Sequence, residues 1–130
     1  KSALEAKLKV IFCIGETLSE KRKNKTKSIL SKQMKVGLKN IKNTSKIFVA
    51  YEPIWAIGSG IVPKSKDLFK TVEFIKSKFK KKSPKVLYGG SVNPQNIVYL
   101  KKINNIDGFL IGGASQNVKK FIDIVKKTYS

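Results

Sequence analysis

A carboxylate that directly follows an apolar run is the residue of this sequence best placed for acid–base chemistry. Glu52 comes after Ile47–Tyr51 and before Pro53, which disfavours a helical conformation at Glu52 and keeps it extended. Ile54 and Trp55 follow, so the carboxylate can be partly removed from water. Partial desolvation makes a carboxylate a stronger base, suited to taking a proton from a substrate. A solvated loop carboxylate fits the same position, and the position alone does not decide between the two.

The segment after Glu52 has the composition of a loop that closes over a ligand. Pro53–Pro63 carries a Pro at each end, Gly-Ser-Gly in the middle and apolar residues on both sides. Stiff ends and a compact apolar body suit a lid that moves as a unit and excludes water. The alternative is a loop packed permanently on the core. The lid residues that we single out are Pro53, Ile54, Trp55, Ala56, Ile57, Gly58, Ser59 and Gly60.

Two glycine-rich turns are candidates for binding an anion. Gly89-Gly90-Ser91 and Gly112-Gly113 each follow an apolar run and precede a segment with helical character. Glycine lets backbone N–H groups approach an anion closely, and a helix start adds a partial positive charge. One such turn is also common for purely structural reasons. Two on consecutive strands match the phosphate site that (β/α)8 barrels often build after their last two strands.

Four short apolar runs would position these residues. We expect strands at Val10–Ile14, Ile47–Tyr51, Val86–Tyr88 and Phe109–Ile111, with the candidate residues at their carboxyl ends. Between the strands, apolar residues recur every three or four positions, as in helices that bury one face. These residues are Leu30, Met34, Leu38 and Ile41, then Leu68, Val72, Ile75 and Phe79, and finally Val118, Ile122, Val125 and Tyr129.

Residues that cap helices support this order of elements. The candidates are a capping box of Thr17 and Glu20, Asn93 before Pro94, Ser65 and Ser115. With a leading helix at Ser2–Leu8, strands and helices alternate along the chain, which predicts a parallel sheet covered by helices. Two architectures fit: a small doubly wound sheet, or half of a (β/α)8 barrel, whose full length is about 250 residues.

The composition excludes several kinds of chemistry. The 130 residues include 28 Lys and Arg against 8 Asp and Glu, a net charge of +20, and no His. Imidazole catalysis and His-ligated metals are therefore excluded within this chain. The single cysteine, Cys13, excludes an internal disulfide, and we expect it to be packed rather than nucleophilic. No apolar run reaches the ~18 residues of a membrane-spanning helix and no signal peptide is evident, so a reducing, cytoplasmic setting is expected.

The strong positive charge raises nucleic-acid binding as an alternative function. Its support is weak, because nearly all of the bases are Lys and aromatic residues are not interleaved with them for base stacking. A solvated, lysine-rich surface explains the charge equally well, so we expect no nucleic-acid partner and no membrane partner. The chain starts at Lys1 and its only Met is Met34, and we expect it to be a piece of a longer protein.

Four segments resemble the triosephosphate isomerase family and follow one another in that family's order. They are VIFCIGE at Val10–Glu16, AYEPIWAIGSG at Ala50–Gly60, YGGSV at Tyr88–Val92 and DGFLIGGAS at Asp107–Ser115. The resemblance runs essentially from end to end of the chain but covers only the C-terminal half of the family's enzymes. It implies an α/β fold in which residues 1–130 form about four βα units, the C-terminal half of a single (β/α)8 TIM-barrel domain. The implied activity interconverts dihydroxyacetone phosphate and glyceraldehyde 3-phosphate.

The resemblance also implies a role for each candidate residue. Glu52 would be the catalytic base, Pro53–Val62 the lid, and Tyr88 with Ser91 would keep the lid closed. Glu16 and Cys13 would support the site from nearby, and for Glu16 we favour a structural role. The residues that would bind the substrate phosphate are Gly58, Ser91, Gly112 and Gly113. No cofactor or metal is implied, and the family forms homodimers whose contacts lie mostly in the other half.

The family's remaining catalytic groups have no counterpart in this sequence. They are an Asn and a Lys after its first strand and a His after its fourth, and this chain contains no His at all. We expect none of the chain's lysines to replace them, because none lies at a strand end facing the substrate. The isolated chain should therefore have almost no isomerase activity. A stand-alone phosphate-binding half-barrel, or a remnant without catalysis, is the alternative.

Overall fold

In the computed structural model, which describes residues 1–79 and 83–130, four strands form one parallel sheet. They are β1 (Val10–Ile14), β2 (Ile47–Tyr51), β3 (Lys85–Tyr88) and β4 (Gly108–Phe109), in the spatial order β1-β2-β3-β4. All three pairings are parallel, as predicted. β4 starts one residue earlier than expected and is shorter, because the chain leaves the sheet after the Leu110 N–H donates to Tyr88 O (2.9 Å).

The strand order distinguishes between the two expected architectures. A doubly wound sheet reverses its strand order at a switch point, whereas a barrel adds strands in the order of the chain. Here the order follows the chain without a reversal. Within the described residues β1 and β4 each pair with a single strand, so the sheet is a segment of a barrel that is not closed.

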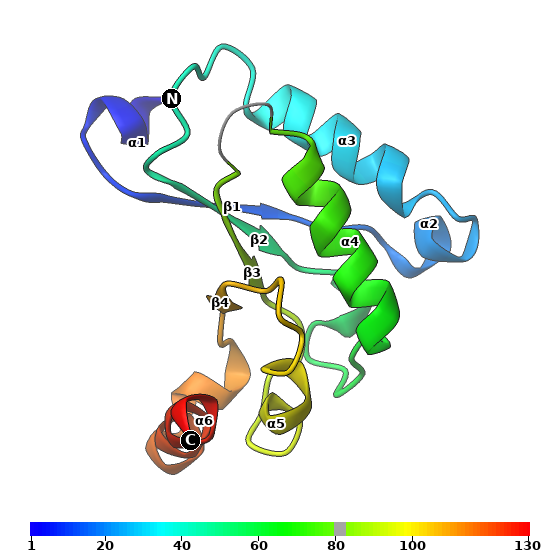
Figure 1. The fold of residues 1–130 in the computed structure, drawn as a ribbon, viewed down its shortest axis with the longest axis vertical. Helices are drawn as coiled ribbons and strands as arrows, with labels where there is room; N and C mark the ends of the chain where they lie inside the picture. The colour runs from blue at the N-terminus through cyan, green and yellow to red at the C-terminus, as the bar shows by residue number, and fades with distance from the viewer. Residues whose placement is uncertain (80–82) are drawn as a thin grey trace.

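Helices lie between the strands along the chain and cover one face of the sheet. In the described part they are α1 (Ser2–Glu5), α2 (Leu18–Arg22), α3 (Thr26–Gly37), α4 (Ser65–Ser77), α5 (Ile97–Leu100) and α6 (Val118–Tyr129), with short 3₁₀ helices η1 (Ile54–Ala56) and η2 (Gly113–Gln116). α3 and α4 lie side by side, with α3 against β1 and α4 against β3, while α5 and α6 lie near β3 and β4 (Figure 1). No helix of the described residues lies on the opposite face (Figure 1).

Local capping explains where some of these helices begin. Thr17 and Glu20 form the predicted capping box at α2, with the Glu20 N–H donating to the Thr17 hydroxyl and the Glu20 carboxylate accepting from Thr17 N–H (2.8 Å). The expected cap at Ser115 is wrong, because that residue lies in η2 and Asn117 accepts the Lys120 N–H instead. Ser65 is the first residue of α4 rather than its cap.

Three helices are shorter than expected. α3 ends at Gly37, so Leu38 and Ile41 lie beyond it, and α4 ends at Ser77, so Phe79 lies beyond it. α1 ends at Glu5 rather than Leu8, and the left-handed backbone conformation of Lys7 (φ 60°) follows its end. Periodicity therefore identified the helices but not their ends.

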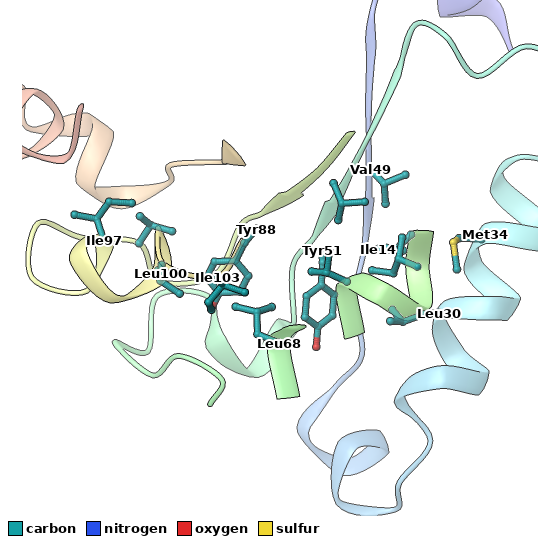
Figure 2. Packing of buried hydrophobic residues seen from close by; sticks show 14 of the residues in the cluster. Ile14, Leu30, Met34, Val49, Tyr51, Leu68, Tyr88, Ile97, Leu100 and Ile103 are labelled. Atoms are coloured by element: carbon teal, nitrogen blue, oxygen red, sulfur yellow. The ribbon is translucent and has the colours of Figure 1, made fainter. Parts of the chain in front are cut away.

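The hydrophobic core lies between the sheet and its helices. Alternate strand residues face this layer, and Val49, Val86 and Tyr88 are completely buried there. Figure 2 shows Tyr51 and Ile14 near the buried side chains of α3 and α4, and Tyr88 near Leu100 and Ile103. Fully burying an apolar side chain of this size stabilises the fold by roughly 1.5–3 kcal/mol. The core thus fixes the strands whose carboxyl ends carry the candidate site.

The opposite face of the sheet is exposed in the described chain. Ile11, which points to this face, is 48% exposed, and Cys13 is also exposed. The expectation that Cys13 is packed is therefore wrong, because the helices cover only the other face. Within the described residues, no helix has both the length and the apolar character needed to cross a bilayer.

Candidate active site

Glu52 is positioned by the end of β2 and by glycines on both neighbouring strands. Its N–H donates to Ile14 O (2.8 Å), which continues the sheet, and its side chain is half-buried. A Cβ added at Gly15 would lie 1.8 Å from the Glu52 carbonyl oxygen, and one at Gly89 would lie 2.6 Å from Glu52 Cγ. Both neighbours must therefore be glycine. We did not predict from the sequence that these two glycines make room for Glu52. The signal that could have shown it is a glycine directly after each of the two strands that flank β2.

Cys13 lies beside Glu52 at the end of β1. Partial removal from water, a hydrogen bond to Glu52 and the negative charge of Glu52 together raise the pKa of the Cys13 thiol to about 11. At neutral pH the thiol is therefore protonated, and a protonated thiol is a poor nucleophile. The expectation that Cys13 is not a nucleophile agrees with this environment, although its burial was predicted wrongly.

Glu16 fastens the first part of the lid to the sheet. Its carboxylate is fully buried and accepts hydrogen bonds from Tyr51 Oη (3.1 Å) and Trp55 Nε1 (3.1 Å). Its carbonyl oxygen accepts the Ile54 N–H (3.0 Å). Burial and the nearby Glu16 carboxylate raise the pKa of Tyr51, so this hydroxyl remains a donor. These bonds fit a structural role for Glu16.

The candidate lid is buried at its ends and partly exposed in between. Pro53 and Pro63 are buried, whereas Ile54 and Ile57 are each more than half exposed. Ala56, between these two isoleucines, is completely buried, so this part of the lid is packed on the core. Gly58 (φ 66°) and Gly60 (φ 75°) adopt left-handed conformations that favour glycine.

A serine from the next strand end joins the lid to the glycine-rich turn. Ser91 Oγ accepts the Gly60 N–H (3.0 Å) and donates to Ala56 O. Tyr88, the other residue expected to keep the lid closed, lies in the core, and its hydroxyl has no hydrogen-bond partner among the described residues. Ser91 thus forms hydrogen bonds with the lid, whereas the Tyr88 hydroxyl forms none among the described residues.

The predicted base and phosphate-binding residues meet in one pocket. Glu52, Gly58, Ser91, Gly112 and Gly113 all line a cavity of about 650 Å³. Of the other lid residues, Ile57 lines it as well, whereas Pro53, Ile54, Trp55, Ala56, Ser59 and Gly60 do not. The described residues contain no group of three acidic, cysteine or histidine side chains that could bind a metal ion. The arrangement combines a carboxylate base with backbone N–H groups that suit an anion.

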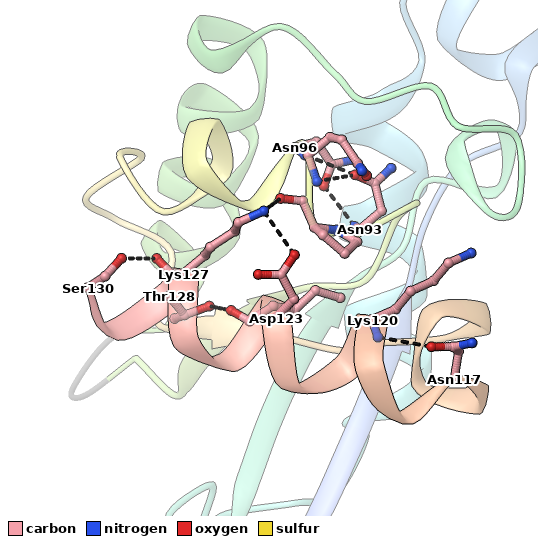
Figure 3. A network of polar contacts seen from close by, with 11 residues as sticks. Asn93, Asn96, Asn117, Lys120, Asp123, Lys127, Thr128 and Ser130 are labelled. Atoms are coloured by element: carbon pink, nitrogen blue, oxygen red, sulfur yellow. Dashed lines mark hydrogen bonds and ion pairs between the residues drawn. The ribbon is translucent and has the colours of Figure 1, made fainter.

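A polar network fixes the pocket wall beyond Ser91 (Figure 3). Asn93 Oδ1 accepts the N–H groups of Gln95 and Asn96, each at 2.9 Å, and Asn96 Nδ2 donates to Ser91 O. The prediction that Asn93 caps a helix beginning at Pro94 is therefore wrong for α5, which begins at Ile97 with Asn96 at its cap position, although the Asn93 side chain does accept N–H groups of the preceding turn. Lys127 Nζ on α6 donates to Pro94 O (3.1 Å) and so fastens α6 to the same turn.

Two residues of this pocket were missed at the level of sequence. Lys119 and Lys120 line it from the first turn of α6. Neither lies at a strand end, as expected, yet both contribute to the same cavity as Glu52. The only feature of the sequence that could have indicated them is their position at the start of a helix shortly after the Gly112-Gly113 turn. In a chain with 28 basic residues, two further lysines did not stand out.

Comparison with known proteins places these observations in a family. Residues 1–128 match the family model for triosephosphate isomerase. The chain is 43% identical over 125 residues to the triosephosphate isomerase of Thermodesulfovibrio yellowstonii, covering 92% of this chain and 51% of the relative. It is 44% identical over 124 residues to that of Mycoplasma mobile, covering 95% of this chain and 51% of the relative.

The fold agrees with this match. The crystal structure of triosephosphate isomerase from Bartonella henselae superposes with a TM-score of 0.84 at 32% identity, over 98% of this chain and 53% of that one. The chain therefore spans about half the length of the relatives it matches. By sequence and by its parallel α/β TIM fold, the chain belongs to the triosephosphate isomerase family.

Proposed function

We propose that this chain carries the base, the lid and the phosphate-binding turns of a triosephosphate isomerase. The observation that supports this proposal is the shared pocket, in which Glu52 faces the same cavity as Gly58, Ser91, Gly112 and Gly113. The substrate would be a phosphorylated triose, interconverted between dihydroxyacetone phosphate and glyceraldehyde 3-phosphate.

Residues 1–130 would form the C-terminal half of a single (β/α)8 domain. In barrels of this kind the phosphate site commonly lies after the last two strands and at a short extra helix. The turns Gly89-Gly90-Ser91 and Gly112-Gly113 follow β3 and β4, and η2 is a short helix directly after β4. This arrangement supports β3 and β4 as the last two strands of the barrel. In the whole enzyme the dimer contacts would then lie mostly in the other half.

The proposed chemistry is a proton transfer between adjacent carbons. N–H groups of Gly58, Gly112 and Gly113, with the Ser91 hydroxyl, would bind the phosphate and position the triose. Glu52 would take the proton next to the carbonyl and return it to the neighbouring carbon. The lid, with Ser91 and in its closed form Tyr88, would exclude water during this step.

The chain alone would lack the groups that stabilise the intermediate. Removing the proton builds negative charge on the carbonyl oxygen, and each missing donor to that oxygen costs roughly 10²–10³ in rate. The resemblance assigns these donors to a Lys and a His outside this chain. A base and such donors suffice for the step, so no cofactor or metal enters the proposal.

Reconstitution tests this function. The 130-residue chain would be purified free of host isomerase and assayed for glyceraldehyde 3-phosphate turnover, alone and mixed with the N-terminal half of the Mycoplasma mobile relative. We expect turnover only in the mixture, and its loss in Glu52→Gln. Turnover by the chain alone near that of a whole isomerase, abolished by Glu52→Gln, would contradict the proposed inactivity. Phosphate binding without reconstitution would favour the stand-alone phosphate-binding alternative.

A further inference from the structure

The charges that line the pocket are unusual for a phosphate site. Its charged lining residues are Glu52 and Asp123, both acidic, and Lys119 and Lys120, both basic. A phosphate group would be repelled by the two carboxylates if no cation were present. Asp123 is paired with Lys127. Lys119 and Lys120 against Glu52 therefore leave the lining with a net positive charge, which favours the entry of an anion.

Both lysines are available for a ligand. The ion pairs of the described residues involve Lys1, Lys76 and Lys127, and neither pocket lysine takes part in one. Asp123, one turn further along α6, pairs instead with Lys127 (2.9 Å). The Lys120 side chain extends from α6 on the side that carries Asp123 (Figure 3). The positive charge on this wall of the pocket is therefore not neutralised by a neighbour.

The positions of these lysines are also unfavourable for the helix. The start of a helix carries a partial positive charge that favours Asp or Glu and disfavours Lys. α6 has no acidic residue in its first turn, and its cap is the neutral Asn117. Two lysines at this place are electrostatically unfavourable for α6, and its first turn contains no acidic residue to offset them. A local cost of this kind is typical of residues selected for binding.

The wall that carries the lysines is fixed in place. Lys127 Nζ bonds Pro94 O (3.1 Å), and Lys101 Nζ of the segment after α5 bonds Lys127 O and Ser130 O, each at 2.7 Å. Pro94 and Asp123, the residues on the two sides of this bridge, both line the pocket. These bonds fasten the last turn of α6 to the segment after α5 and to the turn at Pro94.

We propose that Lys119 and Lys120 form a cationic rim that makes the pocket selective for dianionic phosphate monoesters over monoanions. This rests on the proposed phosphate subsite at Gly112, Gly113 and Ser91 and adds to it the source of its charge selectivity. At a given distance a dianion interacts twice as strongly with each lysine as a monoanion does. The backbone N–H groups would orient the phosphate, and the lysines would supply the net attraction that neutral N–H groups do not.

Binding of two methyl esters tests this rim on the full chain. Methyl phosphate is a dianion at pH 8, because the second pKa of a phosphate monoester is about 6, and dimethyl phosphate is a monoanion. Amide NMR shifts of Gly112, Gly113 and Ser91 would give the affinity of each at low and high salt. In the double variant Lys119→Gln/Lys120→Gln, we expect methyl phosphate to bind roughly tenfold more weakly at low salt, with a smaller change for dimethyl phosphate.

Lys126→Gln is the control for general charge, since it removes one positive charge, half of the change in the double variant, from an exposed position of α6 outside the pocket. It should change either affinity by less than about twofold. Unfolding midpoints should show that the double variant is at least as stable as the parent chain, because it relieves the unfavourable helix start.

The outcomes separate the rim from the subsite. Methyl phosphate shifts centred on Gly112 and Gly113 that persist unchanged in the double variant would overturn the rim and leave the phosphate subsite intact. Equal weakening by Lys126→Gln, or equal weakening for both esters, would reduce the effect to the general charge of the chain and also overturn the rim. Absence of shifts at these glycines in the parent chain would overturn both.

Discussion

The two sides of the pocket are built by different means. On the side of Glu52, side chains in fixed positions determine the geometry, through the buried Glu16 hydrogen bonds and the clearance given by Gly15 and Gly89. On the side of α6, backbone turns and exposed lysines form the wall. Ser91 joins the two, because it contacts the lid and lines the pocket. The first side should respond to single-atom changes, and the second to charge and salt.

The largest effect should come from filling the space beside the base. In Gly89→Ala the new Cβ would lie 2.6 Å from Glu52 Cγ and 3.0 Å from Glu52 Cδ, so the carboxylate must move. A displacement of about 1 Å can cost about 10² in rate, and we expect a loss of that order in the reconstituted enzyme. Gly108→Ala is the control, because its Cβ meets only a Leu87 side-chain atom at 3.1 Å. Equal turnover in the two variants would remove the proposed role of Gly89.

The next effect should come from the buried acceptor under the lid. Glu16→Leu leaves Tyr51 Oη, which is buried, without its acceptor, and we expect the free energy of unfolding to fall by about 1–3 kcal/mol. Glu16→Gln keeps one acceptor oxygen and should cost less. Adding Tyr51→Phe to Glu16→Leu should restore part of the loss, because the buried Tyr51 hydroxyl is then removed and only the part-buried Trp55 Nε1 is left without its acceptor. Urea unfolding measures the free energy of unfolding of each variant. If the losses of Glu16→Leu and Tyr51→Phe simply add in the double variant, the proposed coupling between Glu16 and Tyr51 is contradicted.

The bounds of several strands and helices could be predicted from neighbouring residues in the sequence. The wrong predictions concern features that depend on how distant segments pack together. Apolar runs located β1 and β2 at their observed bounds, and Thr17 with Glu20 capped α2, since both depend on neighbouring residues alone. The exposure of Cys13 depends on which face the helices cover, which strand alternation does not reveal.

The same limit applies to the candidate site. Placing the motifs at strand ends was enough to bring Glu52 together with Ser91, Gly112 and Gly113 in one pocket. The clearance at Gly15 and Gly89 required the strand pairing, and the position of Lys119 and Lys120 required the packing of α6. The complete burial of Tyr88 likewise follows from tertiary packing.

A smaller effect concerns the reactivity of Cys13. Its pKa is raised to about 11 from the usual 9.0 by desolvation, with Glu52 contributing a hydrogen bond and its charge. Glu52→Gln removes the charge but not the desolvation, so the pKa should fall part of the way and the thiolate fraction at pH 8 should rise. We expect alkylation by iodoacetamide to accelerate by about three- to tenfold. Glu20→Gln, which removes the same charge from α2, should leave the rate unchanged, and a matching acceleration there would contradict the pairing.

The smallest effect should come from the bridge on the α6 side. Lys127→Met removes the ion pair with Asp123 (2.9 Å) and the bond to Pro94 O (3.1 Å), but both partners of the ion pair are more than a third exposed. Water and salt already weaken such a pair, so its loss should cost only about 0.2–1 kcal/mol, and less at high salt.

Urea unfolding of Lys127→Met at low and high salt checks this, with Lys126→Met as the control for losing a lysine from α6. A loss above about 2 kcal/mol that does not change with salt would mean that the Lys127 contacts stabilise the fold as much as the buried Glu16 hydrogen bonds do. The two sides of the pocket would then be built alike, and the division between a side fixed by side-chain geometry and a side governed by charge would fail.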